Sequence, residues 1–142
     1  MTLLLRPPRE ADLESLFEHQ ADPAVKAMAE HPGRNREAFF THMRQTVLPG
    51  PGIFRVIEED GVVVGNVVSW PSDERWWLGY VLAPSAWGRG VASWAVKTFL
   101  PLAPRPLFAD VAVKNLASQR VLEKHGFRRV ATHPEGVEYR LD

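Results

Sequence analysis

The segment that most constrains the fold joins an apolar strand to a helix through two glycines. The run from Trp76 to Ala83 is predicted to be a strand, residues 94–100 a helix, and Leu107 to Val113 a further strand. A strand, a crossover helix and a second strand of one sheet form a right-handed unit whose strands are parallel. We therefore expect at least one parallel strand pair in this chain.

The glycine turn itself, Trp87-Gly88-Arg89-Gly90-Val91-Ala92-Ser93, also has a chemical interpretation. Glycines allow the backbone to approach a ligand closely, and the first amides of the following helix are free to bind an anion. The turn lacks the Gly-Lys-Ser/Thr of a P-loop and the third glycine of the dinucleotide fingerprint. Taken alone, it is either a phosphate or pyrophosphate site or only a tight turn.

The remaining pattern divides into a helical part and a strand-rich part. Helices are expected from Glu10, from Asp22 to Ala29 and from Asn35 to Val47, with Asp22 and Asn35 as N-caps. A meander follows over residues 53–58, 62–70 and 75–82, and after the crossover come a helix over 115–125 and an antiparallel pair over 127–132 and 137–141.

The expected order is β-α-α-β-β-β-α-β-α-β-β in one domain that spans residues 1–142. This order predicts an α/β (α+β) fold with a mixed central sheet of about seven strands, antiparallel in its first half. Helices should flank both faces of the sheet.

Composition excludes several classes of protein. The chain has 17 basic and 17 acidic residues, and this balance argues against a general nucleic-acid binder. No apolar run approaches the roughly 20 residues that span a bilayer, and the start of the chain lacks the features of a signal peptide. There is no cysteine, hence no disulfide and no thiol nucleophile, and the histidines show no metal-ligand spacing. We expect a cytoplasmic protein without a metal and without nucleic-acid or membrane partners.

Two motifs carry a resemblance to a known family. Gly79-Tyr80-Val81-Leu82-Ala83-Pro84, followed by the glycine turn, is similar to the acetyl-CoA motif of the GNAT superfamily of N-acetyltransferases. The run from Asn115 to Phe127 resembles the second signature of its RimJ/RimL-like branch, in which a Trp such as Trp87 begins the first motif. Leu5-Arg6-Pro7 and Asp12-Leu13 fit the same branch. The resemblance implies the GNAT-like fold and covers nearly the whole chain.

The resemblance implies acetyl-CoA as co-substrate and a primary amine as acceptor, with direct attack in a ternary complex. The amides of residues 89–93 would bind the pyrophosphate, with Arg89 as a charge partner. The pantetheine arm would lie along the strand before the turn. The resemblance thus gives ten positions that bind the co-substrate: Val81, Leu82, Ala83, Arg89, Gly90, Val91, Ala92, Ser93, Asn115 and Ser118.

For the chemistry, the resemblance implies a backbone amide near Leu82 as the oxyanion donor and Ser118 as the proton donor to the thiol. Ser118 is alternatively an ordinary polar residue of a first helical turn, and Asn115 an N-cap, a role compatible with CoA binding. The tyrosine that many family members place one turn before the Gly-Phe pair is replaced by Leu122. Candidates for the base are Asp73, Glu74, Asp110, His31, His133 and Glu135, and a water chain is an alternative to all of them.

The sequence leaves the acceptor open between a protein N-terminus and a small molecule. Trp76 and Trp77 are adjacent on one strand, so one of them should face away from the core. That residue either packs under a flanking helix or lines the acceptor pocket or a homodimer interface. An alternative from another class is a non-catalytic module that binds or senses acyl-CoA, because the family tyrosine and a strand glutamate are both absent.

Overall fold

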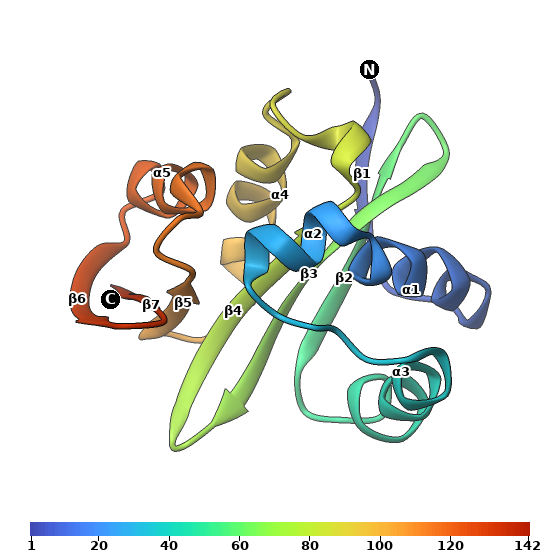
Figure 1. Cartoon of the computed structure of the whole chain (residues 1–142), viewed down its shortest axis with the longest axis horizontal. Coiled ribbons are helices and arrows are strands. Elements are labelled where there is room, and N and C mark those ends of the chain that lie inside the picture. Colours follow the sequence, from blue (N-terminus) through green and yellow to red (C-terminus); the bar gives the residue numbers. More distant parts are fainter.

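The computed structural model describes all residues, 1–142, and its centre is one seven-stranded sheet. The order of the strands is β1-β2-β3-β4-β5-β7-β6, and every neighbouring pair is antiparallel except β4 and β5. The expected mixed sheet is therefore confirmed (Figure 1). The strands are β1 Leu3–Arg6, β2 Ile53–Glu59, β3 Val62–Ser72, β4 Arg75–Leu82, β5 Leu107–Val111, β6 Arg128–His133 and β7 Gly136–Leu141.

Three helices precede the β2–β3 hairpin, as the residue pattern predicts, although the expected order of elements counts only two. Asp22 accepts a hydrogen bond from the Ala24 amide at 2.8 Å, and Pro23 follows it, so a second helix begins directly after the first. Asn35 caps the third helix through the Ala38 amide at 2.8 Å. The helices are α1 Leu13–Ala21, α2 Pro23–Ala29, α3 Arg36–His42, extended by a π-helical turn over Met43–Val47, α4 Val91–Phe99 and α5 Leu116–Lys124.

Helices cover both faces of the sheet, as the alternation of strand side chains requires. Val56 and Ile57 are neighbours on β2 and both are fully buried, but they belong to different hydrophobic clusters. Val56 packs with residues of α1 and α3, whereas Ile57 belongs to the larger cluster with α4 and α5. Since adjacent strand residues point to opposite faces, the two clusters are the two sides of the sheet (Figure 1).

The two central parallel strands separate after a short contact. Pairing of β4 with β5 is limited to Trp76 with Leu107 and Trp77 with Phe108, although β4 continues to Leu82. The second half of β4 therefore has a strand neighbour only on its β3 side. The two strands therefore splay apart, and this opens a gap at the carboxyl ends of the parallel strands, where open α/β sheets bind ligands.

The paired tryptophans on β4 point to opposite faces, as predicted. Trp76 packs against the larger cluster, while the Trp77 ring lies 5.8 Å from the ring of Phe108. Trp77 does not line the cavities described below, so of the alternatives for the outward tryptophan the acceptor pocket does not hold for this residue. Trp70, opposite Trp77 on β3, lines one instead.

Candidate active site

The glycine turn has the geometry of an anion site. Gly88 and Gly90 have φ values of +72° and +80°, in the left-handed region that favours glycine. Helix α4 begins directly after Gly90, whose carbonyl accepts the first helical hydrogen bond, from the Trp94 amide at 3.0 Å. The amides of residues 91–93 therefore have no carbonyl partner in the helix, and the helix dipole favours an anion in front of them.

Arg89 does not face this anion site in the structure. Its guanidinium forms a bidentate ion pair with Glu59, with N–O distances of 2.5 and 2.7 Å, and also donates to the Ser85 carbonyl. The ion pair lowers the pKa of Glu59. The expectation of Arg89 as a free charge partner is corrected here, because the end of β2 brings a carboxylate against the turn.

A cavity of about 310 Å³ lies between the turn, the end of β4 and α5. Eight of the ten predicted co-substrate positions line it, and Ala83 and Arg89 lie outside. The sequence did not indicate that α2 also lines this cavity, through Val25, Met28 and Ala29. The predicted residues that line it are Val81, Leu82, Gly90, Val91, Ala92, Ser93, Asn115 and Ser118.

The backbone at the end of β4 leaves one amide directed into the gap. Ala83 donates its N–H to the Val64 carbonyl at 2.8 Å, so this amide is committed to β3. In an antiparallel ladder successive residues alternate, so Leu82 directs its N–H away from β3, toward the side where β5 has diverged. The Leu82 carbonyl accepts from the Trp87 indole at 3.1 Å, which fixes the chain at this point.

Two hydroxyl groups meet in the same cavity. The Tyr80 and Ser118 oxygens lie 2.5 Å apart, joining β4 to the first turn of α5. Asn115 caps that helix by accepting from the Ser118 amide at 3.1 Å, so its N-cap role is confirmed and its side-chain amide nitrogen remains available as a donor. Burial raises the pKa of Tyr80 above its ordinary value, so the phenol stays protonated at neutral pH.

Tyr80 is a functional candidate that the sequence analysis missed. Tyr80 lies in the acetyl-CoA motif, but the resemblance places the family tyrosine on α5, where Leu122 is found. Alternation along β4 could have indicated it, since Tyr80 and Val81 point to opposite faces. Tyr80 packs on the face that carries α5, which brings the phenol to Ser118.

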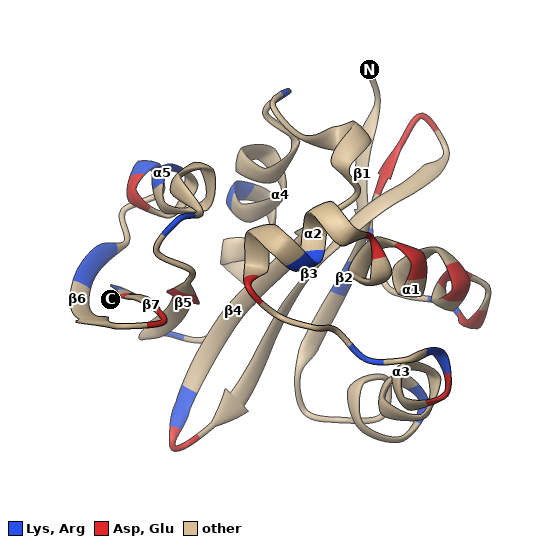
Figure 2. Ribbon diagram, viewed as in Figure 1, with Lys and Arg blue, Asp and Glu red and all other residues tan.

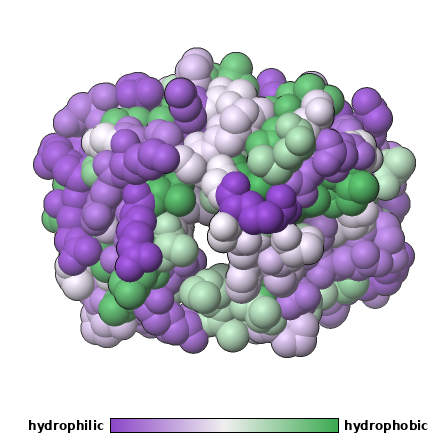
Figure 3. Space-filling view, turned by 90° about the horizontal axis from the view of Figure 1, so that it is seen from above, coloured by the Kyte–Doolittle hydropathy of each residue, from purple (hydrophilic) through white to green (hydrophobic).

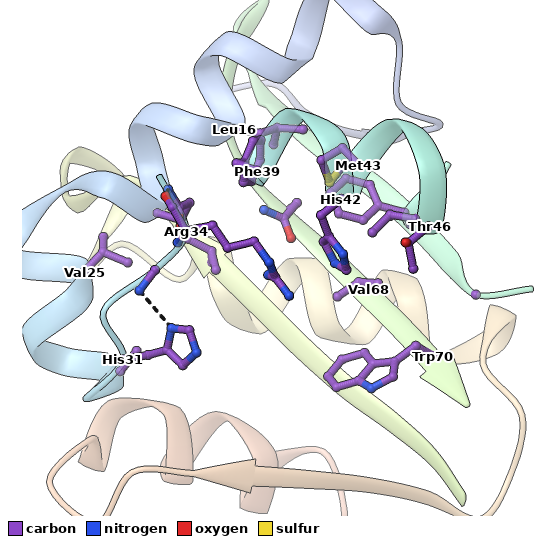
Figure 4. A pocket seen from close by; sticks show the side chains of 18 of the residues that line it. Leu16, Val25, His31, Arg34, Phe39, His42, Met43, Thr46, Val68 and Trp70 are labelled. Atoms are coloured by element: carbon purple, nitrogen blue, oxygen red, sulfur yellow. Dashed lines mark hydrogen bonds between the residues drawn. The ribbon is translucent and has the colours of Figure 1, made fainter. Parts of the chain in front are cut away.

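A second cavity, of about 610 Å³, adjoins the first. Three residues line both cavities: Val25, Ala29 and Val81. The larger cavity lies on the α1–α3 side of the sheet, with α1, α2, α3, β3 and the α2–α3 segment around it (Figure 4). The surface is hollowed near its centre when the molecule is viewed from above (Figure 3).

Of the six residues predicted as candidate bases, only His31 lines the larger cavity. Asp73 and Glu74, both with positive φ, form the β3–β4 turn, and Asp110 pairs with His133 at 3.0 Å. The His31 Nδ1 accepts the Gly33 amide at 2.9 Å, so its lone pair at Nδ1 is already engaged. Glu135 lies in the β6–β7 turn, outside both cavities.

His42 is a candidate base that the sequence analysis did not propose. It lines the larger cavity together with Phe39, Met43 and Thr46, and this spacing of three, four and seven residues places all of them on one helical face. Burial is the main cause that lowers the pKa of His42, and the Arg34 charge adds to it. The imidazole is thus neutral at neutral pH and can accept a proton.

The structure contains no cluster of three or more His, Cys, Asp or Glu residues that could hold a metal ion. None of its helices has the length and apolar character that crossing a membrane requires. The arrangement is therefore two adjoining cavities, one with free helix amides and a hydroxyl pair, the other with a neutral imidazole. Such a pair of cavities suits group transfer between a phosphate-containing donor and a second small group.

Comparison with known proteins agrees with this geometry. The family model described as an acetyltransferase (GNAT) domain matches residues 2–128. No curated protein sequence matches the chain. Because the match spans most of the chain, the protein belongs to the GNAT acetyltransferase family.

Solved structures with low sequence identity share the fold. A RimL ribosomal L7/L12 α-N-protein acetyltransferase, in complex with coenzyme A, is 18% identical, with a TM-score of 0.81 over 99% of this chain and 93% of that one. A phosphinothricin acetyltransferase from Sinorhizobium meliloti, in complex with acetyl-CoA, is 19% identical, with a TM-score of 0.80 over 99% and 86%. An aminoglycoside acetyltransferase in complex with coenzyme A is 20% identical, with a TM-score of 0.76 over 98% and 93%.

Proposed function

We propose that the protein transfers the acetyl group of acetyl-CoA to a primary amine by direct attack in a ternary complex. One observation carries this proposal: the two cavities adjoin at Val25, Ala29 and Val81, so a thioester entering from one side meets an amine entering from the other. The neighbours solved with coenzyme A or acetyl-CoA support this donor.

The donor side suits the phosphate and amide chemistry of CoA. The free amides of residues 91–93 would bind the pyrophosphate, which is the standard chemistry of a helix N-terminus. The unpaired edge of β4 would pair with the pantetheine amides as an added strand, which leaves the Leu82 amide for the thioester carbonyl. Ala83 would contribute its carbonyl or side chain only, because its amide already binds Val64.

The residues present supply each step of acetyl transfer. A neutral amine attacks the thioester carbonyl, a C–N bond forms, and the Leu82 amide stabilises the oxyanion. The C–S bond then breaks, and the leaving thiolate takes a proton from the Tyr80–Ser118 pair, so that Ser118 acts together with Tyr80. His42, or water in the cavity, accepts the proton that the amine loses.

The choice between a protein N-terminus and a small amine rests on the acceptor side. The motifs around Trp87 and Asn115 support placement near the RimJ/RimL-like branch. Neighbours of the same fold are named for ribosomal protein L7/L12, for phosphinothricin and for aminoglycosides, so the fold accommodates acceptors of very different size.

The direct test measures CoA binding by calorimetry and thiol release from acetyl-CoA with a panel of primary amines. We expect CoA binding and amine-dependent release of free thiol, with the acetylated amine as the second product. Binding without turnover on any amine would instead favour a non-catalytic acyl-CoA module. Failure to bind CoA would contradict both functions.

A further inference from the structure

The acceptor-side cavity carries unbalanced positive charge. Its 21 lining residues include two cations, Lys26 and Arg34, together with the imidazoles of His31 and His42, and none of the 21 is Asp or Glu. Figure 2 shows basic positions on α2 and on the segment that leads into α3. A ligand in this cavity therefore meets cationic groups and no carboxylate.

Arg34 differs from the other arginines of this region in having no ion-pair partner. Arg36 pairs with Glu14, and Arg44 pairs with Glu10, both on the outer surface. Arg34 instead extends into the cavity toward His42 (Figure 4). Its guanidinium therefore keeps its charge and its five donors available to a ligand.

The backbone of Arg34 is held in place by one side chain of α1. The Gln20 side chain accepts from the Arg34 amide at 2.9 Å and donates to the Arg34 carbonyl at 3.1 Å. Gly33 next to it has a φ of +72°, and a Cβ at this position would lie only 2.6 Å from the Gln20 side-chain oxygen. The segment is thus fixed, and the base of the Arg34 side chain is directed toward the cavity.

The rest of the cavity wall is largely apolar. Phe39 contributes from α3, Met43 from the π-helical turn that extends it, and Val68 and Trp70 from β3 (Figure 4). Trp70 lies over Gly79, where a Cβ would come within 3.1 Å of the indole, so this glycine makes room for the ring. An acceptor that fits combines an apolar body, which packs on this wall, with an amine and a group that binds Arg34.

We propose that the acceptor is a small amine that also bears a carboxylate, with an apolar body, such as an apolar amino acid. The inference rests on the proposed function and names the substrate class of its acceptor side. Arg34 binds the carboxylate through its planar guanidinium, with Lys26 adding positive charge nearby. The amine then points toward Val25, Ala29 and Val81, where the two cavities meet.

The same charges discriminate against polycationic amines. A polyamine or aminoglycoside would place further ammonium groups against Arg34 and Lys26, without a carboxylate in the lining to compensate. Like-charge contacts of this kind lower affinity, and rejection by repulsion is an ordinary source of specificity. The cavity is therefore expected to select by charge as well as by shape.

The test compares acid and amide probes that differ in one charge. Phenylalanine and phenylalaninamide, and leucine and leucinamide, are titrated by calorimetry into the CoA-bound protein, which cannot turn over, and are then assayed with acetyl-CoA. In Arg34→Gln we expect the acid-to-amide affinity ratio to fall roughly ten- to a hundredfold, the range of a charge-assisted hydrogen bond. The acid and amide probes differ in amine basicity, but this difference is the same for wild type and variant. It therefore cancels when the acid-to-amide affinity ratio of wild type is divided by that of Arg34→Gln.

Arg36→Gln is the matched control, because it removes the same charge two positions away, outside the cavity. Arg36→Gln should leave the acid-to-amide affinity ratio at its wild-type value. Arg34→Lys should give a ratio between those of Arg34→Gln and wild type. An equal ratio in wild type and Arg34→Gln, or spermidine binding more tightly than either acid, would overturn the inference. Acetyl transfer without acid preference contradicts only this inference, whereas acid preference without transfer contradicts only the proposed function.

Discussion

The donor side and the acceptor side of the candidate site offer different kinds of groups to their ligands. The donor side offers mainly main-chain groups, namely the free amides that open α4 and the unpaired edge of β4, to which the Asn115 side chain adds the cap of α5. The acceptor side consists of side chains from three helices, three strands and the segments between them, and its polar groups include Arg34 and His42. Backbone recognition tolerates changes of sequence, whereas side-chain recognition does not. The fold thus determines the donor, and individual side chains determine the acceptor.

The largest effect is expected where the backbone itself is altered. Gly90→Glu would place a carboxylate at the start of α4 and a side chain on a residue with a φ of +80°. Like-charge contact with the pyrophosphate costs several kcal/mol, which corresponds to roughly a thousandfold loss of CoA affinity. Calorimetry measures this loss.

Gly61→Glu is the control for that substitution. Gly61 also has a positive φ, of +84°, and like Gly90 it has no atom within 4 Å of an added Cβ, but it lies in the β2–β3 turn. The variant should therefore carry a similar backbone strain and the same charge, and still bind CoA. Unchanged affinity in Gly90→Glu would show that the pyrophosphate binds elsewhere.

The next effect concerns the hydroxyl pair, which belongs to the donor side but consists of side chains. Tyr80→Phe should lower kcat about a hundredfold, the lower range of general acid catalysis, with little change in CoA affinity. Ser118→Ala should lower kcat as well, and the double variant should be no slower than Tyr80→Phe, because the two hydroxyls act as one unit. Additive losses in the double variant would mean that the two groups act separately.

The donor side is easier to predict from the sequence than the acceptor side, because main-chain groups follow from local sequence and side-chain contacts do not. The strand, the glycine turn and the helix are local signals, so the parallel pair and eight of the residues that line the smaller cavity could be placed in advance. The contacts of Arg89 and Tyr80 could not, because they depend on residues 30 and 38 positions away in the chain. Spacing alone does not show which side chain of a distant hairpin or helix lies opposite.

The acceptor side was the least predictable part for the same reason. Its walls come from segments scattered between Leu16 and Val81, and they become neighbours only when α1, α2 and α3 pack on one face of the sheet. His31 was considered and His42 was not, although helical spacing from Phe39 gave His42 a place on a packed face. Only the packing of these elements makes that face the wall of a cavity.

A smaller effect, and a pH-dependent one, is expected on the acceptor side. The pKa of His42 lies below its ordinary value of 6.5, and Arg34 opposes protonation, so the imidazole is neutral above that pKa and charged below it. If His42 accepts the amine proton, kcat/KM falls as the pH falls through this pKa. His42→Gln should lower kcat/KM roughly a hundredfold at pH 7.5 and lose this acidic limb.

The measurement for His42 is a pH profile of kcat/KM with one acceptor for wild type and variant. Titration of the amine itself is common to both profiles, so only their difference reports on His42. His125 provides a control, because its pKa is also lowered by burial but it lies at the end of α5, against Ser93. His125→Gln should keep the acidic limb, and a profile of His42→Gln parallel to wild type would favour the water chain.

The smallest effect is expected on the donor side. Substitution of Arg89 tests whether CoA binding depends on the main chain alone. Because the Arg89 guanidinium is paired with Glu59, Arg89→Gln should change CoA affinity by less than about fivefold, the range of an exposed ion pair. Glu59→Gln would free the guanidinium, and CoA should then bind a few-fold more tightly at low salt, since the released charge attracts phosphate. The double variant should behave like Arg89→Gln. A hundredfold loss in Arg89→Gln alone would mean that Arg89 leaves Glu59 for the pyrophosphate when CoA binds, and that a side chain, in addition to the backbone, recognises the donor.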